Sequence, residues 1–171
     1  HVARRFSAAP TPDVYKRVLT IGWNSWIDEQ FAMTDTTPAM AAWLKKFRHW
    51  FPTADMGMKE INAWAAETGY SLTGVPILHG GLQRAATMYL RQMLSPAKVR
   101  EAWTEFWLDN FAMPYVDKYP GDIFDTDKDV RLTALSTVPN VIKTVYSRGL
   151  VYSALDNNQN KNCLLYTSDA A

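Results

Sequence analysis

The sequence predicts an all-α protein, an irregular array of about seven or eight helices. Apolar residues recur at three- and four-residue spacing along most of the chain, which is the period of an α-helix with one buried face. Thr-Pro and Ser-Pro pairs stand before several of these runs, and they are typical helix starts. No alternation of apolar and polar residues persists over six positions, so no strand of ordinary length is predicted.

The first third of the chain is predicted to form three helices. The first begins at Pro12 after Thr11 and ends where Gly22 interrupts it. The second follows directly over 23–32, and the third begins at Pro38 and stops before Pro52. The residues expected on the buried stripes of the second and third helices are Trp23, Trp26, Ile27, Phe31, Met40, Trp43, Leu44, Phe47, Trp50 and Phe51.

The middle of the chain continues the helical pattern. A helix is expected over 58–69, then a short stretch with strand or loop character over 70–81, then helices over 81–94 and 96–112. The inward positions of the last two are predicted to be Leu82, Ala85, Ala86, Tyr89, Met93, Val99, Ala102, Trp103, Phe106, Trp107 and Phe111. A loop rich in proline and aspartate over 113–129 and two helices near 128–136 and 139–147 complete the array.

Composition excludes several classes of protein. The chain is 47% hydrophobic and 20% charged, as expected of one globular domain, and its net charge of +1 gives no bulk attraction to nucleic acid. No apolar run reaches the roughly eighteen residues that a membrane span needs. No phosphate-binding loop, dinucleotide fingerprint or Cys/His cluster occurs, and no cofactor is indicated.

Three charged patterns are candidate functional sites. Asp125, Asp127 and Asp129 match the first positions of a calcium loop, but Val130 and Ser136 replace its glycine and glutamate, so a metal site is disfavoured. Glu101, Glu105 and Asp109 share one helical face, which is ordinarily a solvated stripe. The basic side chains of Lys45, Lys46 and Arg48 are interpreted as the polar side of a helix near its C-terminal end. Binding of a polyanion or a membrane surface by these residues is the weaker alternative.

The final residues, 163–171, differ from the rest. They read CLLYTSDAA, and all nine back-translate in one frame to the transposase mosaic-end adapter of shotgun sequencing libraries. We therefore expect residues 1–162 to be the N-terminal helical part of one larger domain, a metagenomic type of fragment that is incomplete at its C-terminus. On this interpretation the only cysteine, Cys163, is not part of the fold, and disulfides and thiolate metal sites are absent.

Three segments resemble one bacterial family, catalogued as domain of unknown function 1800. The first 31 residues resemble its opening pattern, the segment 99–111 its aromatic helix, and 154–160 its L-D-N turn. The matching positions are His1, Arg4, Arg5, Thr11, Pro12, Gly22, Trp26, Asp28, Glu29, Gln30, Arg100, Glu101, Phe106, Trp107, Phe111, Leu155, Asp156, Asn157 and Asn160. Two histidines of the family's aromatic helix are Leu108 and Asn110 here, so no metal or proton-transfer role passes to that pair.

The resemblance implies a mostly helical, exported or periplasmic protein that is often encoded beside an exported sulfatase-like protein. The first functional hypothesis is accordingly a helical region for binding and assembly with that partner. The alternative is a hydrolase whose site is completed by residues beyond this chain, with Asp109 and Asp156 as candidate carboxylates. The chain contains no complete catalytic constellation, so whether it is an enzyme stays open at this point.

Overall fold

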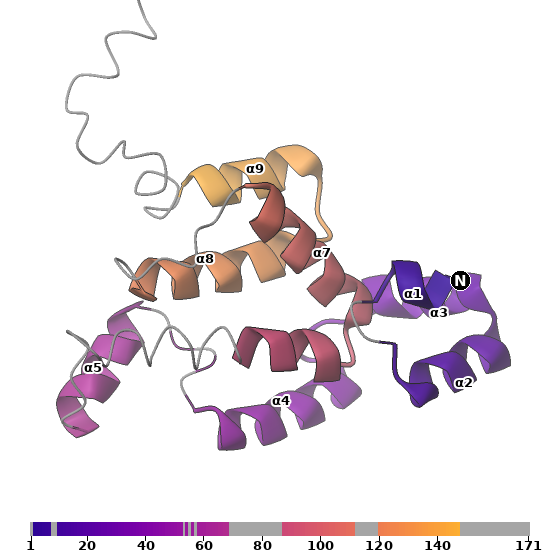
Figure 1. Ribbon diagram of the computed structural model, residues 1–171, viewed down its shortest axis with the longest axis horizontal. Coiled ribbons are helices and arrows are strands. Elements are labelled where there is room, and N and C mark those ends of the chain that lie inside the picture. The colour runs from indigo at the N-terminus through magenta and orange to yellow at the C-terminus, as the bar shows by residue number, and fades with distance from the viewer. Residues whose placement is uncertain are drawn as a thin grey trace, which may run out of the picture.

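The computed structural model describes residues 2–7, 10–52, 54, 56, 58–68, 87–111 and 120–147. Within these ranges the regular structure is helical and there is no strand, which confirms the all-α prediction. A helical segment covers 87–94. The labelled helices of Figure 1 are α1 (Val2–Arg5), α2 (Pro12–Ile21), α3 (Trp23–Ala32), α4 (Pro38–Trp50), α5 (Met58–Thr68), α7 (Lys98–Asn110), α8 (Pro120–Thr133) and α9 (Val138–Tyr146).

The α2–α3 pair is joined at a single glycine. Gly22 has a φ of 82° and a ψ of 159°, a backbone conformation that only glycine adopts readily. Its N–H donates to the Val18 carbonyl at 2.9 Å, and its own carbonyl accepts from the Trp26 N–H at 3.1 Å. The same residue therefore ends one helix and starts the next, and this corner packs α2 against α3.

Helix α4 packs against the start of α7. Met40 and Leu44 of α4 are buried with Ala97, and the half-buried Met33 and Trp43 pack against this group. Trp50 was predicted on the same stripe, and this was wrong, because its side chain is 65% exposed. At 3.6 residues per turn, Trp50 lies roughly a quarter turn from the centre of the stripe.

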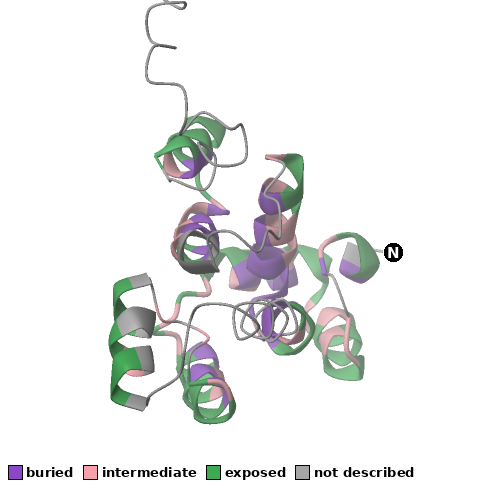
Figure 2. Cartoon of the chain, turned by 60° about the vertical axis from the view of Figure 1, so that its left-hand side comes forward, coloured by how far each residue is buried: buried purple, intermediate pink, exposed green. Residues whose placement is uncertain are grey.

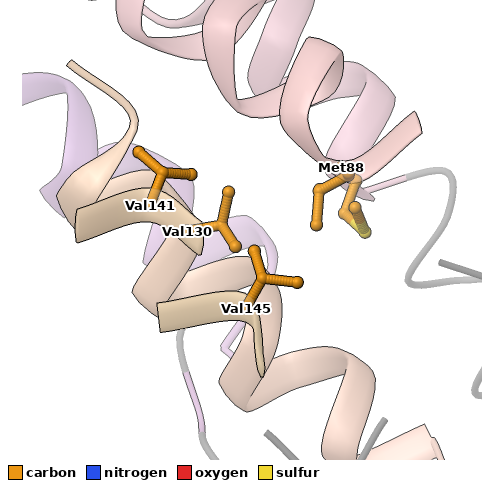
Figure 3. Packing of buried hydrophobic residues seen from close by; sticks show 5 residues of the cluster. Met88, Val130, Val141 and Val145 are labelled. Atoms are coloured by element: carbon orange, nitrogen blue, oxygen red, sulfur yellow. The ribbon is translucent and has the colours of Figure 1, made fainter. Parts of the chain in front are cut away.

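The centre of the molecule is formed by α7 and α8. Helix α7 contacts α3 and α8, and α8 also contacts α5 and α9. Apolar side chains from α7, α8, α9 and the segment 87–94 make one core cluster, part of which Figure 3 shows: Met88, Leu108, Val130, Val141 and Val145. The buried positions gather on the facing sides of these helices, while the outward sides are exposed (Figure 2).

The Asp-rich part of the predicted loop is helix. Residues 113–129 were expected to form a loop, but α8 already begins at Pro120, and 113–119 lie outside the described residues. Proline suits the first turn of a helix, and Val130 is fully buried on the inner side of α8. Packing against α7 and α9 therefore outweighs the low helix propensity of the aspartates.

Several apolar side chains lie outside the core, contrary to prediction. Large side chains at the edges of the predicted stripes are exposed, because the inward face of each helix is narrower than its apolar pattern: Trp23, Phe31, Tyr89, Met93 and Phe106. In the segment 87–94 it is Met88 that is buried instead. Leu82, Ala85 and Ala86 lie outside the described residues.

No helix in the described ranges has the combination of length and hydropathy that crossing a membrane requires.

Candidate functional site

Glu101, on α7, lies at the centre of a buried cluster of charged residues. Its side chain is completely buried, with Arg131 of α8 on one side and Arg91 of the segment 87–94 on the other. Arg131 Nε donates to Glu101 Oε2 at 3.0 Å, and Arg91 Nε lies 3.6 Å from Oε1. One carboxylate is thus held between two guanidinium groups that come from separate elements.

Asp127 supplies the second carboxylate of this cluster. It stands one turn before Arg131 on α8, so the two side chains meet on the same face of the helix. Arg131 Nη2 donates to Asp127 Oδ1 at 2.8 Å, and Nη1 donates to Oδ2, so the pair is bidentate. Burial lowers the pKa of Arg131, but the charges of Asp127 and Glu101 outweigh it and raise that pKa above its ordinary value. Arg131 therefore stays cationic.

The first turn of α7 is anchored by further polar contacts. Arg100 Nη2 donates to Asp35 Oδ1 at 2.7 Å, and Gln30 Oε1 accepts from the Val99 N–H at 3.3 Å. Lys98 Nζ donates to the Met93 carbonyl, and burial lowers the pKa of Lys98 while the charge of Glu101 opposes that shift. The contacts of Arg100 and Val99 connect α7 to the loop after α3 and to α3 itself, and that of Lys98 connects α7 to the segment 87–94.

A cavity of about 500 Å³ lies beside the charged cluster. Its innermost charged side chains are Arg91, Asp127 and Arg131, each no more than 6% exposed. Apolar and charged residues of α4, α5 and α8, of the segment between α4 and α5, and of the loop before α4 complete the wall: Asp35, Arg48, Pro52, Ala54, Met56, Glu60, Lys128 and Leu132. The volume lies in the range of small-molecule sites.

The arrangement is suited to binding more than to proton transfer. Glu101 is fully buried, so it does not contact a ligand in the cavity, and both oxygens of Asp127 already accept hydrogen bonds from Arg131. A general acid or base must reach the proton that it transfers. These two carboxylates instead hold the guanidinium of Arg131 in place at the cavity wall.

The three aspartates considered for calcium lie on α8. Asp125 and Asp129 are one turn apart and share a face of the helix, whereas Asp127 lies between them in sequence and points to the opposite side. Asp127 is moreover committed to Arg131. Across the described part of the chain, no group of three His, Cys, Asp or Glu side chains is placed to hold a metal ion.

The prediction that Glu101, Glu105 and Asp109 form a solvated stripe on α7 is wrong for Glu101. Glu101 is buried, Glu105 is half-buried and Asp109 is exposed. Partial burial and then the neighbouring charge of Asp109 raise the pKa of Glu105. The stripe turns inward at Glu101 because α7 faces α8 there and Arg131 offers a partner.

The structure places the family-motif residues in three groups. Trp26, Arg100 and Glu101 are buried, and Trp107 is half-buried, with its Nε1 donating to the Ala134 carbonyl at 3.1 Å. The exposed family-motif positions are Arg4, Arg5, Pro12, Gly22, Asp28 and Phe106. The structure does not describe the burial of His1, Leu155, Asp156, Asn157 and Asn160.

Sequence reasoning missed Arg91 and Arg131. The four-residue spacing of Asp127 and Arg131 is a detectable signal, but it has meaning only if the segment is helical, and a loop was predicted there. The basic group on α4 is divided between two environments. Lys45 and Lys46 are exposed to solvent, whereas Arg48 lines the cavity.

The comparisons with known proteins give one match. The model of a family described as "Protein of unknown function (DUF1800)" matches residues 1–163. No curated protein and no solved structure matches the chain.

Proposed function

The chain belongs to the DUF1800 family, and from this premise we propose that it is a helical binding and assembly region of an exported bacterial protein. Its partner in this proposal is an exported sulfatase-like protein. The partner and the export rest on the family resemblance of three sequence segments. The binding role rests also on the geometry of the cavity.

The observation that carries the proposal is the mutual neutralisation of the charges around the cavity. Glu101 and Asp127 are both engaged by Arg131, and Asp35 is engaged by Arg100. Such a network holds side chains in fixed positions, which favours recognition of a partner group. It leaves few described carboxylates at the cavity for chemistry.

The proposal is tested by recovering the complex from cells. The full-length gene product and the neighbouring sulfatase-like protein are co-expressed and purified from the periplasmic fraction. We expect a stable complex that is lost when this helical region is deleted. A second arm compares the amount of complex recovered with two charge-reversal variants. Lys128→Glu changes a residue at the cavity, and Lys16→Glu changes one on the exposed surface of α2. Absence of any complex with the intact protein contradicts the proposal.

A hydrolase is the second candidate, and one observation favours it. Glu105 lies one turn before Asp109 on α7, and partial burial together with the charge of Asp109 raises the pKa of Glu105, so the structure places two carboxyl groups side by side. The site would be completed by residues outside the described ranges, with Asp156 among the candidates. Full-length protein should then hydrolyse a member of an ester, phosphate or glycan panel, and Glu105→Gln should abolish that turnover. Inactivity on all three panels contradicts this candidate.

A further inference from the structure

We propose that the outward face of α4 binds the surface of an anionic lipid membrane. Helix α4 lies at the edge of the molecule (Figure 1). Its outward face consists of five exposed residues at three- and four-residue spacing: Ala42, Lys45, Lys46, His49 and Trp50. The buried residues of the helix, Met40, Leu44 and Phe47, lie on the opposite side. No residue of the outward face lines the cavity, so this surface is separate from the one considered above.

The exposure of Trp50 places an aromatic side chain beside basic ones. The sequence pattern assigned the aromatic residues of α4 to the buried stripe and the bases to the opposite face, but Trp50 is 65% exposed and stands one turn after Lys46. Its indole forms no hydrogen bond and no ring contact with the described residues. An indole has an apolar body and a polar N–H, which suits the boundary between lipid and water.

The lysines of this face are not balanced by acidic side chains. Helix α4 contains no aspartate or glutamate, and neither Lys45 nor Lys46 forms an ion pair with the described residues. The helix dipole does not account for the two lysines, because its effect is confined to the last turn, where the basic residues are Arg48 and His49. The face therefore presents positive charge to the solvent, which is complementary to an anionic surface.

A lipid surface fits this combination better than a nucleic acid does. Proteins that bind nucleic acids neutralise many phosphates along a groove or stripe of bases, whereas this face has two lysines and the net charge of the chain is only +1. An anionic membrane surface attracts each nearby lysine, and a tryptophan beside the lysines adds the burial of apolar area among the headgroups. We expect the binding to be reversible and to weaken as salt is raised.

The test measures cosedimentation of the full chain with lipid vesicles. One set contains phosphatidylcholine alone, and the other contains phosphatidylcholine mixed with anionic phosphatidylglycerol. We expect the chain to bind the mixed vesicles, to lose that binding as salt is raised, and to bind the neutral vesicles at least tenfold more weakly. Equal binding to both sets would overturn the proposal. Tighter binding to single-stranded DNA than to the mixed vesicles, at the same ionic strength, would assign the face to nucleic acid instead.

Two double variants of equal net charge locate the lysines that contact the lipid. Lys45→Gln combined with Lys46→Gln should weaken binding to the mixed vesicles about ten- to thirtyfold, since each lysine near an anionic surface contributes about fivefold. Lys16→Gln combined with Lys143→Gln removes the same charge from exposed positions of α2 and α9, and should change the affinity much less. Equal losses in the two double variants would overturn the assignment to α4.

A second pair of variants tests the role of Trp50. Trp50→Ala should weaken binding to the mixed vesicles about five- to tenfold, because the indole no longer buries apolar area among the headgroups. Trp23→Ala removes an indole that is 53% exposed at the start of α3, and should leave the affinity unchanged. Circular dichroism confirms that each variant is folded. Equal affinities of these two variants would show that Trp50 does not contact the lipid and would overturn the proposal.

Discussion

At the scale of single residues, Glu101 is the side chain on which the charged cluster depends. It accepts from Arg131 at 3.0 Å and lies 3.6 Å from Arg91 Nε, and its Oε1 accepts no hydrogen bond from the described residues. A buried charge of this kind is costly to desolvate, and the charges of Arg131 and Arg91 offset that cost. Glu101 holds Arg131 by a hydrogen bond and lies beside Arg91, and it is not itself among the residues that line the cavity.

The first prediction concerns the charge of Glu101. Glu101→Gln keeps the shape of the side chain but leaves Arg91 and Arg131 with one buried carboxylate fewer. We expect the free energy of unfolding to fall by about 3 kcal/mol, the low end for breaking a buried pair, since Asp127 still holds Arg131. Urea denaturation followed by circular dichroism measures it. Glu29→Gln, in the exposed pair with Arg17, is the control and should change stability little. Equal effects of the two substitutions would contradict the prediction.

Glu105 leads to a prediction about pH. Its pKa is raised by partial burial and by Asp109, so the folded state binds the proton more tightly than the unfolded chain does. The associated stability is present below the unfolded pKa and is lost as pH rises through the folded pKa. Glu105→Gln removes this loss. The variant should therefore gain stability relative to the natural chain between pH 4 and pH 7, as measured by denaturant unfolding at both values. A relative loss over that interval would show that the sign is wrong.

At the scale of elements, the sequence predicted helix starts better than it predicted inward faces. Thr11-Pro12 and Thr37-Pro38 stand where α2 and α4 begin, and Gly22 separates α2 from α3, because prolines and glycines act through local backbone sterics. The inward side of a helix depends on its neighbours, which local patterns do not specify. Trp50 accordingly carries the spacing of the buried stripe and is exposed.

The candidate site was predictable only in part, for the same reason. Glu101 was selected as a family-motif position, but its burial depends on Arg131, which lies 30 residues away on another helix. Arg91 comes from a third element. No single helical pattern contains this grouping, and the segment that holds Asp127 was predicted as a loop. Spacing within one helix reveals the Asp127–Arg131 pair, whereas the wider cluster requires the tertiary structure.

At the scale of elements, the testable prediction concerns Gly22, which forms the corner between α2 and α3. Gly22 has φ 82° and ψ 159°, and a Cβ added there would meet nothing within 4 Å. The cost of Gly22→Ala is therefore backbone strain alone, about 1–3 kcal/mol. Thermal unfolding measures it, with the exposed Asn24→Ala in the first turn of α3 as control. An unchanged melting temperature for Gly22→Ala would mean that the corner adopts another conformation.

At the scale of the whole molecule, packing and charge converge on α8. This helix contacts α5, α7 and α9, contributes Val130 to the apolar core, and carries Asp127 and Arg131 on the charged side. Helix α9 depends on α8 in turn, since its buried Val141 and Val145 pack in the cluster with Val130. Removing α9 would therefore expose the core behind it.

The last prediction follows from that arrangement and from the adapter-like residues. Deleting 163–171 should leave the melting temperature and the helical circular dichroism signal unchanged, because these residues resemble translated adapter and the family match includes only the first of them. Deleting 138–171 removes α9 as well and should lower the melting temperature by 10 °C or more, on the order of the loss expected when two buried valines of a domain this size lose their contacts. Comparable losses in both deletions would show that residues 163–171 contribute to the fold, and the adapter interpretation would then be wrong.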